Sequence, residues 1–355
     1  MSRVRVGCIG AGWWATVNHF PLLAARDDVE LVAVCRPDRD LLLQVQKTFG
    51  FRHATEDYRE LLALGLDAVV ITTPHHLHYE HAMQALNRPL HILCEKPMTL
   101  QAAQAWDLAA AVARQKTHFL IPYGWNYKPF MTTAKQMMDD GAVGDIEFVQ
   151  CHMASPTKGF FSGNGGVPRE TAPTLVAPDP KTWQDPAHGG GYAHGQLTHS
   201  TALMFWLTGL RAAEVRAIAT APNSAVDMYD AATVTFGNGA IGVISGAATL
   251  PDNEKFQVDL RIFGSQGCLL IDVERERLEL RRHDGRNRSV AVTPGEGAYT
   301  CETPPRRFID LIQGASTYNQ SPVQIGARSV ELLEAQQRSA AAGGDAARID
   351  LSLGG

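Results

Sequence analysis

Charge is sparse in this sequence, and long apolar runs are missing. Charged residues make up 19% of its 355 residues, and neither sign forms a block of five or more. Nucleic acids and anionic membranes bind clustered Lys and Arg, so we expect neither as a partner. No stretch reaches the roughly 18 apolar residues of a membrane-spanning helix, and the chain opens without a secretory leader. We therefore expect a cytoplasmic protein that acts on small molecules.

The sequence also lacks paired cysteines and recognisable sets of metal ligands. The six cysteines are scattered, and four lie in apolar β-like runs, as small hydrophobic side chains do. No disulfide framework is expected. Four histidines lie close together, but no cysteine or acid completes a set of metal ligands around His75, His76, His78 and His81. The sequence predicts no metal site.

Length and composition predict two globular domains. The hydrophobic fraction of 45% is large enough for sizeable cores. Domains usually contain about 100–200 residues. We place one domain over residues 1–123 and the other over residues 124–355.

The chain begins with a β-α-β pattern. RVRVGCIG predicts a strand, AGWWATVNHFPLLAAR a helix and VELVAVCR a second strand, and the turn between the first two reads Gly10-Ala11-Gly12-Trp13-Trp14-Ala15. In this G-x-G-x-x-A pattern, Gly10 permits the tight turn and Gly12 lets a pyrophosphate approach the backbone. Its position between a strand and a helix predicts dinucleotide binding.

Arg36 ends the second strand, where dinucleotide-binding domains place an acid for the ribose. A guanidinium pairs with a 2′-phosphate, which a carboxylate would repel. We therefore favour NADP over NAD. Stacking of Arg36 on adenine, which would suit either cofactor, is the alternative.

Strands and helices continue to alternate over residues 66–115. LDAVVITTPHHLHYEHAMQAL and PLHILCEKPMTLQAAQAWDLAAAVARQ each read as a strand followed by a helix, which predicts a parallel, doubly wound sheet. The turn at Thr73 and Pro74 and the nearby His78 lie at the carboxyl edge of this sheet, where cofactors bind. A helix-cap or surface role is the alternative for His78.

The second half of the chain is rich in strand patterns. IEFVQCHMA, EVRAIATA, AATVTFGNGAIGVISGAAT, FQVDLRIFGSQGCLLIDV and RLELRRH read as successive strands, with hairpin turns at FGNG and GSQG. The segment formed by residues 155–191 is too long to be a simple connection between two elements. Such loops are usually lids or binding loops, or else disordered.

Five motifs occur in one order along the chain: the G-x-G-x-x-A turn, ITTPHHLHYEHA, LCEKPMTL, GWNYKP, and G-G-G with a histidine eight residues after its last glycine. Together they resemble the Gfo/Idh/MocA family, the relatives of glucose-fructose oxidoreductase and inositol dehydrogenase. The resemblance implies an α/β Rossmann domain followed by an α+β domain. The large, mainly antiparallel open sheet of that second domain carries substrate contacts and often forms the interface of a homodimer or homotetramer.

The resemblance also implies hydride transfer between NAD or NADP and a secondary alcohol or ketone of a sugar, sugar acid, glycoside or cyclitol. It maps the two catalytic positions beside the nicotinamide onto Lys96 and His199. Either side chain can exchange the hydroxyl proton if burial lowers the lysine pKa. The residues expected to contact the cofactor are Gly10, Gly12, Trp13, Trp14, Arg36, Thr73, Pro74, His78, Glu95 and Lys96.

Substrate contacts are expected from the second domain. If the chain is helical from Tyr192, one face that would look into the cleft carries Tyr192, Gln196, His199 and Leu203. Burial of that face in the interdomain core is the alternative. The residues expected to contact the carbohydrate or polyol substrate are Asn126, Tyr127, Lys128, Trp183, Asp185, Tyr192, Gln196 and His199.

Two carboxylates of the family pattern G-G-G-x-x-x-D-x-G-x-H-x-x-D are missing, because Gly195 and Ala202 stand at those positions. We expect a bulkier substrate or a side chain from the long loop to fill the first vacated volume, with Asp185 as the candidate acid. An ordinary turn role is the alternative for Asp185. The alternatives for function are redox-neutral chemistry with a retained cofactor, as in oxidoisomerases or NAD-dependent glycosidases, and a non-catalytic dinucleotide sensor.

Overall fold

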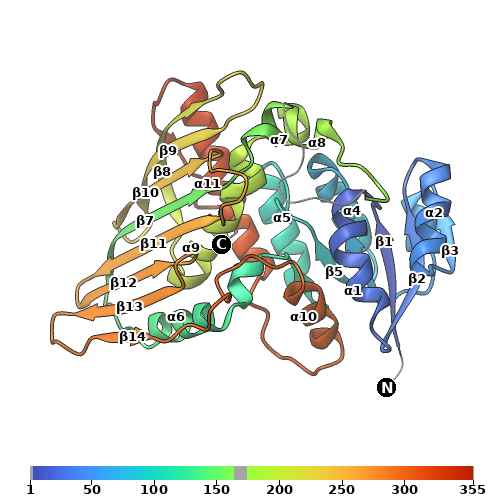
Figure 1. Ribbon diagram of the computed structural model, residues 1–355, viewed down its shortest axis with the longest axis horizontal. Coiled ribbons are helices and arrows are strands. Elements are labelled where there is room, and N and C mark those ends of the chain that lie inside the picture. Colours follow the sequence, from blue (N-terminus) through green and yellow to red (C-terminus); the bar gives the residue numbers. More distant parts are fainter. Residues whose placement is uncertain (1–2, 164–173, 355) are drawn as a thin grey trace.

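The computed structural model describes residues 3–163 and 174–354. Two β-sheets lie on opposite sides of the molecule, and helices fill the space between them (Figure 1). One sheet is parallel and the other is mainly antiparallel. The predicted fold class is therefore confirmed.

The first sheet is parallel in the order β3-β2-β1-β4-β5-β6. All four residues of β4 are buried, as expected for a strand covered by helices on both faces. The order reverses at β1, and doubly wound sheets bind ligands at the carboxyl ends of the strands beside this point. The strands are β1 (Val4–Ile9), β2 (Val29–Cys35), β3 (His53–Thr55), β4 (Ala68–Ile71), β5 (His91–Cys94) and β6 (Phe119–Leu120).

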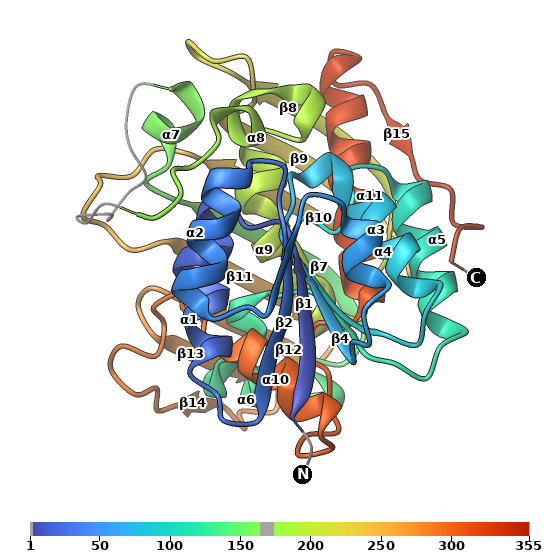
Figure 2. The ribbon, with the colours of Figure 1, turned by 90° about the vertical axis from the view of Figure 1, so that its right-hand side faces the viewer.

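Helices cover both faces of this sheet. Figure 2 shows α1 and α2 on one side of the strands and α4 and α5 on the other. Asp38 caps α2 by accepting a hydrogen bond from the N–H of Leu41, and Gly50 ends that helix in the left-handed conformation. The helices are α1 (Phe20–Ala24), α2 (Arg39–Phe49), α3 (Tyr58–Leu62), α4 (His78–Leu86) and α5 (Ala102–Ala113).

The second sheet has the order β14-β13-β12-β11-β7-β10-β9-β8-β15, and among its described strands every neighbouring pair except β7 and β10 is antiparallel. Buried and exposed residues alternate along β9, so one face of the sheet is covered. The strands are β7 (Ile146–Ala154), β8 (Ala212–Thr220), β9 (Tyr229–Phe236), β10 (Ile241–Ala247), β11 (Gln257–Gly264), β12 (Gly267–Asp272), β13 (Arg277–Arg282), β14 (Arg288–Val290) and β15 (Ala347–Arg348).

The inner face of the second sheet packs on α9 and α11, which lie between the two sheets in Figure 1. All but the last residue of α9 are buried, in keeping with its apolar run ALMFWL over residues 202–207. The helices of this half are α6 (Pro129–Asp139), α7 (Lys158–Ser162), α8 (Pro180–Gln184), α9 (Thr198–Thr208), α10 (Thr303–Ile312) and α11 (Val323–Ala341).

Helix α10 packs against the first domain although it lies far along the chain. Phe308 and Ile309 are buried in the same apolar core as Phe20 of α1. Arg26 also donates a hydrogen bond from Nη2 to Asp310, at 3.0 Å. The predicted division at residue 123 stays a prediction, but residues 303–312 do not follow it in their packing.

A buried carboxylate on α11 hydrogen-bonds to α5 of the first sheet layer and forms an ion pair with Arg211, just before β8. The Glu331 carboxylate, on α11, is 3% exposed. It accepts hydrogen bonds from Trp106 Nε1 at 2.8 Å and from Arg211 Nη2 at 2.7 Å and Nε at 3.0 Å. Buried charges require such partners, so this carboxylate holds one indole and one guanidinium in place.

We expect Glu331→Ala to lower the free energy of unfolding by about 3–5 kcal/mol, because it leaves the Arg211 charge and the Trp106 N–H without their buried partner. Urea unfolding followed by circular dichroism measures this. Arg348→Ala is the control, because its ion pair with Glu214 joins an 88% exposed guanidinium to a partly exposed carboxylate and should contribute less than about 1 kcal/mol. Equal losses in the two variants would contradict the assignment.

Candidate active site

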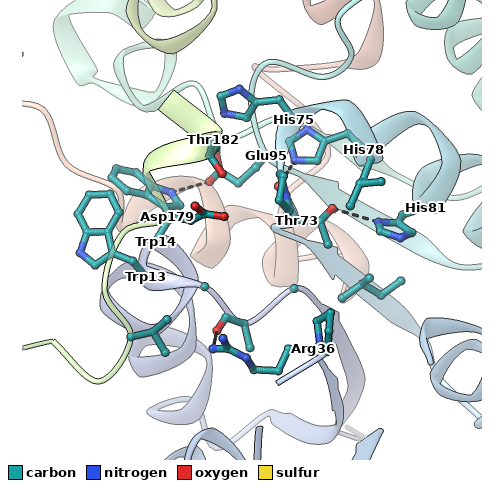
Figure 3. Close-up of a pocket in the computed structure, with 18 of the residues that line it drawn as sticks. Trp13, Trp14, Arg36, Thr73, His75, His78, His81, Glu95, Asp179 and Thr182 are labelled. Carbon is teal, nitrogen blue, oxygen red and sulfur yellow. Dashed lines mark hydrogen bonds between the residues drawn. The ribbon is translucent and has the colours of Figure 1, made fainter. Parts of the chain in front are cut away.

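A cavity of about 440 Å³ opens at the carboxyl ends of the strands in the first sheet. Its volume lies within the range of small-molecule sites. Figure 3 shows side chains from the glycine turn, the end of β2, the segment after β4 and the region around α8 converging on it. All ten residues predicted to contact the cofactor line this cavity: Gly10, Gly12, Trp13, Trp14, Arg36, Thr73, Pro74, His78, Glu95 and Lys96.

The glycine turn has the shape that a bound pyrophosphate needs. Gly10 has a φ of +92°, and a Cβ there would lie 2.6 Å from the backbone carbon of Thr72. A Cβ on Gly12 would meet nothing within 4 Å. Gly10 therefore permits close approach of β1 and β4, and the space over Gly12 fits a dinucleotide phosphate.

Arg36 and Glu56, which follows β3, both line the cavity. Arg36 Nη1 donates a hydrogen bond to the carbonyl of Ala11 at 2.8 Å, so the guanidinium lies beside the glycine turn. Burial lowers the pKa of Arg36, although a guanidinium stays ionised. Glu56 pairs with Arg39 at 3.1 Å. The cavity thus carries an acid that the sequence pattern did not indicate.

His78 lines the cavity with both ring nitrogens engaged. Nδ1 lies 2.8 Å from the carbonyl oxygen of Pro97, and Nε2 lies 2.8 Å from that of Thr73. Burial lowers the pKa of His78, and the two carbonyl contacts partly oppose that effect. The ring therefore ties the segment after β4 to the segment after β5, and any cofactor contact uses its carbon edge.

Glu95 is a buried carboxylate whose oxygens are occupied. Oε1 accepts a hydrogen bond from Trp14 Nε1 at 2.8 Å and lies 2.7 Å from His19 Nε2, while Oε2 accepts from the Lys96 N–H at 3.0 Å. Burial acts to raise the pKa of Glu95, but the His19 hydrogen bond and the charges of His19 and Lys96 outweigh it and leave that pKa lowered. Glu95 therefore orients the glycine turn and the lysine segment.

Lys96 follows β5 and reaches across to the second domain. Its ammonium donates a hydrogen bond from Nζ to the carbonyl of Gly195 at 2.8 Å. The Trp14 and Trp183 rings lie 6.0 and 5.6 Å from Nζ, within range of cation–π attraction. Burial lowers the pKa of Lys96, and the charge of Glu95 partly opposes this. A lowered pKa makes it easier for the ammonium to release its proton.

His199, on α9, is buried among the aromatic rings of Trp125, Tyr123 and Tyr299, whose centroids lie 5.7, 6.1 and 5.1 Å from the imidazole. Burial, and then the charge of Lys96, lowers the pKa of His199 well below its usual value. The imidazole is therefore neutral. Its Nδ1 finds no hydrogen-bond partner among the described residues.

The helix before His199 differs from the expectation. Ala193–Leu197 forms a π-helical turn, and α9 begins only at Thr198. The expectation of a single α-helical face is wrong, because a π-turn takes more residues than the 3.6 of an α-helix. Tyr192 instead packs against β10 and donates its hydroxyl hydrogen to the Met153 carbonyl at 3.1 Å. Gln196 stays partly exposed.

The segment after β6 is buried, and Asn126, Tyr127 and Lys128 do not line this cavity. Asn126 is fully buried and donates from Nδ2 to the carbonyl of Gln320 at 2.9 Å. Tyr127 is also buried, and burial raises its pKa. Lys128 Nζ lies 3.4 Å from Thr300 Oγ1. These contacts tie the segment to Gln320 and Thr300, and its role in substrate binding stays a prediction, whereas Trp183 lies directly at the cavity.

Comparison with known proteins agrees with this arrangement. Residues 4–123 match the model of an oxidoreductase family with an NAD-binding Rossmann fold, and residues 131–270 match that of the GFO/IDH/MocA C-terminal domain. The chain belongs to the GFO/IDH/MocA family. Family membership makes this chain an oxidoreductase with an NAD-binding domain.

Its similarity to individual proteins is distant. Levoglucosan dehydrogenase of Pseudarthrobacter phenanthrenivorans is 23% identical over 312 residues, 78% of this chain and 75% of that protein. D-xylose 1-dehydrogenase (NADP(+)) of Haloarcula marismortui is 30% identical over 159 residues, and the match spans less than half of either chain, 44% of each. A solved levoglucosan dehydrogenase complex with NADH and levoglucosan shares the fold, with a TM-score of 0.76, 20% identity and coverage of 98% of this chain and 100% of that one.

An aromatic ring lies where the acid that the resemblance implies at position 195 would project. A Cβ on Gly195 would lie 2.8 Å from Cζ of Phe161, which is 1% exposed. Phe161 belongs to α7 in the long connection, so a side chain from that loop does fill the volume. Asp185 is instead a turn residue: its carboxylate accepts from the Ala187 N–H at 2.9 Å and contacts His188 Nδ1 at 2.7 Å.

Sequence reasoning missed several residues of this GFO/IDH/MocA site. The loop before α10 brings Tyr299 to His199, and Cys301 lies close enough to Lys96 for the Lys96 charge to lower the Cys301 pKa, although burial dominates and raises it to about 12. No motif marks this loop. From the long connection, Val176, Ala177, Pro178, Asp179 and Thr182 line the cavity. Residues 164–173 of the predicted lid lie outside the described residues.

Neither a metal centre nor a membrane span is found in the part of the chain that the structure describes. No three or more His, Cys, Asp or Glu side chains gather around a point there, and no helix is long and apolar enough to cross a bilayer. His75 uses Nδ1 to contact the Gly189 carbonyl, and His76 packs against His188.

We expect Gly195→Asp to lower the free energy of unfolding by about 1–3 kcal/mol, because the new side chain meets the Phe161 ring. Removing that ring with Phe161→Ala should reduce the penalty. The double variant should therefore lose less free energy of unfolding than the sum of the losses in the two single variants, by at least about 0.5 kcal/mol. Urea unfolding measures the coupling. Phe160→Ala in place of Phe161→Ala should give no such relief, and strict additivity for Phe161 would disprove the replacement.

Proposed function

We propose that this protein is an NAD(P)-dependent dehydrogenase or reductase that acts on a secondary alcohol or ketone of a sugar, sugar acid, glycoside or cyclitol. The observation that carries the proposal is the position of Lys96. Its ammonium is buried at one end of the cavity, between two indole rings, and its pKa is lowered. A buried lysine of this kind is suited to proton exchange with a substrate hydroxyl.

The residues around the cavity have separate roles in cofactor binding, positioning and proton transfer. The nicotinamide, when bound, supplies the hydride acceptor or donor. Gly10, Gly12 and Arg36 would hold the dinucleotide, Trp14 and Trp183 keep water from the lysine, and Gly195 orients the ammonium through its carbonyl. In alcohol oxidation the neutral amine form of Lys96 takes the hydroxyl proton and becomes the ammonium, and in reduction the ammonium returns that proton. The neutral imidazole of His199 can accept a hydrogen bond from the substrate hydroxyl or donate one to the ketone oxygen.

The names of the relatives support the substrate class. They include dehydrogenases of levoglucosan and D-xylose. These substrates share neighbouring hydroxyl groups on a ring. A dinucleotide sensor would not need a buried lysine beside a neutral histidine, so this alternative is disfavoured. Redox-neutral chemistry uses the same residues and differs only in whether the cofactor leaves reduced.

A substrate screen tests the proposal. Purified protein is incubated with sugars, sugar acids, glycosides and cyclitols and with NAD+ or NADP+, while absorbance at 340 nm and product masses are followed. Absorbance change with a product two mass units lighter supports net oxidation. A changed product without net absorbance change would instead favour the redox-neutral alternative, and neither change in any mixture would contradict the proposal.

We expect Lys96→Ala and His199→Ala each to lower kcat by ~100-fold or more, because general acid–base groups contribute roughly 10²–10⁴-fold. The dissociation constant for the cofactor, measured by fluorescence titration, should change little. Lys116→Ala and His283→Ala, at exposed positions, are matched controls that should keep the kcat of the wild type. Near-normal turnover in either test variant would remove that residue from the mechanism.

NADP remains our favoured cofactor, but the cavity carries opposing charges. The Arg36 guanidinium attracts a 2′-phosphate, and Glu56 repels it unless Arg39 neutralises the acid. The D-xylose relative is named for NADP(+), whereas levoglucosan dehydrogenase was solved with NADH. The preference for NADP over NAD therefore depends on whether the positive charges of Arg36 and Arg39 outweigh the negative charge of Glu56.

We expect the wild type to bind NADP more tightly than NAD, and Arg36→Asp to lower the NADP affinity by ~10-fold or more, the loss expected for one charged hydrogen bond. Titration of both cofactors measures this. Arg114→Asp, an exposed position at the end of α5, controls for the change in net charge. An unchanged ratio of the two affinities in Arg36→Asp would disprove the role of Arg36.

We also propose a homodimer or homotetramer that forms through the second sheet. The outer face of this sheet exposes four large apolar side chains, Ile218, Ile241, Val243 and Phe263. Exposed apolar side chains gathered on one face are typical of interfaces. Light scattering on the purified protein gives the number of subunits directly.

A further inference from the structure

The π-helical turn Ala193–Leu197 carries the carbonyl that orients Lys96. Such turns are uncommon, and the first N–H groups of any helix lack intrahelical partners. The turn must therefore be held by groups outside itself. The position of the Gly195 carbonyl depends on those groups.

Asp227, just before β9, supplies the two acceptors. Its Oδ2 accepts a hydrogen bond from the Ala193 N–H at 2.7 Å, and its backbone carbonyl accepts from the Tyr192 N–H at 3.0 Å. A carboxylate at a helix N-terminus is also favoured by the helix dipole. One residue therefore satisfies two neighbouring donors at the start of the turn.

The glycine triplet makes this contact possible. Gly191 has a φ of +108°, and a Cβ there would lie 2.1 Å from Asp227 Oδ1. The Gly191 carbonyl in turn accepts a hydrogen bond from the Gly195 N–H at 2.9 Å. The carboxylate thus lies directly against the backbone that leads to Gly195, with no room for a larger group.

We propose that Asp227 is a positioning residue for the reaction, because it fixes the π-helical turn that holds the Gly195 carbonyl against the Lys96 ammonium. The inference rests on the proposed function of Lys96. Asp227 acts through the turn and does not touch the reacting atoms. Position 195 lacks the carboxylate that the resemblance implies, but the Asp227 carboxylate accepts a hydrogen bond at the start of the same turn.

Asp230 provides a matched control. It is a second carboxylate of the same segment, and it accepts a hydrogen bond from Gln336 Nε2 at 3.0 Å. Burial, and then Asp227, raises its pKa well above the usual value, so an amide is a close substitute for its protonated form. A side-chain hydrogen bond with Asp227 also raises that pKa, and the amide of Asp230→Asn can keep donating to Asp227. Among the bonds found in the described residues, none joins Asp230 to the turn itself.

The test compares Asp227→Ala, Asp227→Asn and Asp230→Asn in the full chain, with a substrate found in the screen. Asp227→Ala should lower kcat by ~10-fold, in line with the loss of a charged N-terminal cap, and leave the cofactor KM within about twofold. Asp227→Asn keeps an acceptor oxygen for the Ala193 N–H, so it should recover most of the activity. Asp230→Asn should match the wild type.

Crystal structures of the same variants give a readout that does not depend on turnover. In Asp227→Ala the distance between Lys96 Nζ and the Gly195 oxygen should exceed hydrogen-bond range. If the alanine variant does not fold, Asp227→Glu replaces it, because its additional methylene must displace the turn from Gly191.

Three results would overturn the inference: an unchanged Lys96 to Gly195 distance in Asp227→Ala or its glutamate substitute, an unchanged kcat in that variant, or an equal loss in Asp230→Asn. If the wild type transfers hydride to no substrate, the proposed function fails. The crystallographic distance then still decides whether Asp227 positions the turn.

Discussion

The hydrogen bond between the Lys96 ammonium and the Gly195 carbonyl is the contact on which the site depends. It joins a loop of the first domain to a helical turn of the second, and it satisfies a cation that has been removed from water. A buried ammonium without an acceptor would lose its proton or leave the interior. The two domains therefore have to meet in one arrangement for the lysine to stay where it is.

The Lys96 ammonium is surrounded by aromatic rings and a carbonyl group, with no free carboxylate among its hydrogen-bond partners in the described residues. Glu95 is the nearby carboxylate, and its oxygens are taken by Trp14, His19 and the Lys96 backbone. Aromatic rings enclose the ammonium, and they attract the cation without competing for its proton. Burial is what lowers the pKa of Lys96, whereas a free carboxylate beside it would raise that pKa.

Much of this could be predicted from the sequence, because local rules govern it. The glycine turn, the alternating strands and helices, and the residues around the cofactor cavity follow from patterns that fall within short stretches of chain. The positions of Gln196 and His199 relative to Tyr192 did not follow, because an inserted π-turn shifts every later residue around the helix and leaves no sign in residue spacing.

Contacts between distant segments were the other limit. Phe161 fills the space beside Gly195, Tyr299 packs on His199, and Glu56 enters the cofactor cavity, yet none of them stands in a motif. The side chains that occupy a vacated volume depend on tertiary packing. A pattern can reveal that an acid is missing, but the fold alone determines what replaces it.

The return of α10 to the first domain has a consequence for biosynthesis. Phe308, Ile309 and Leu311 complete the apolar core around α1, and they are translated after almost all of the second sheet. A nascent chain that has emerged only as far as β6 therefore exposes apolar surface that its own residues cannot cover. Domains usually fold in order as they leave the ribosome. Here the N-terminal half must wait for a segment near the other end, so the chain is vulnerable to aggregation and proteolysis until translation is nearly finished.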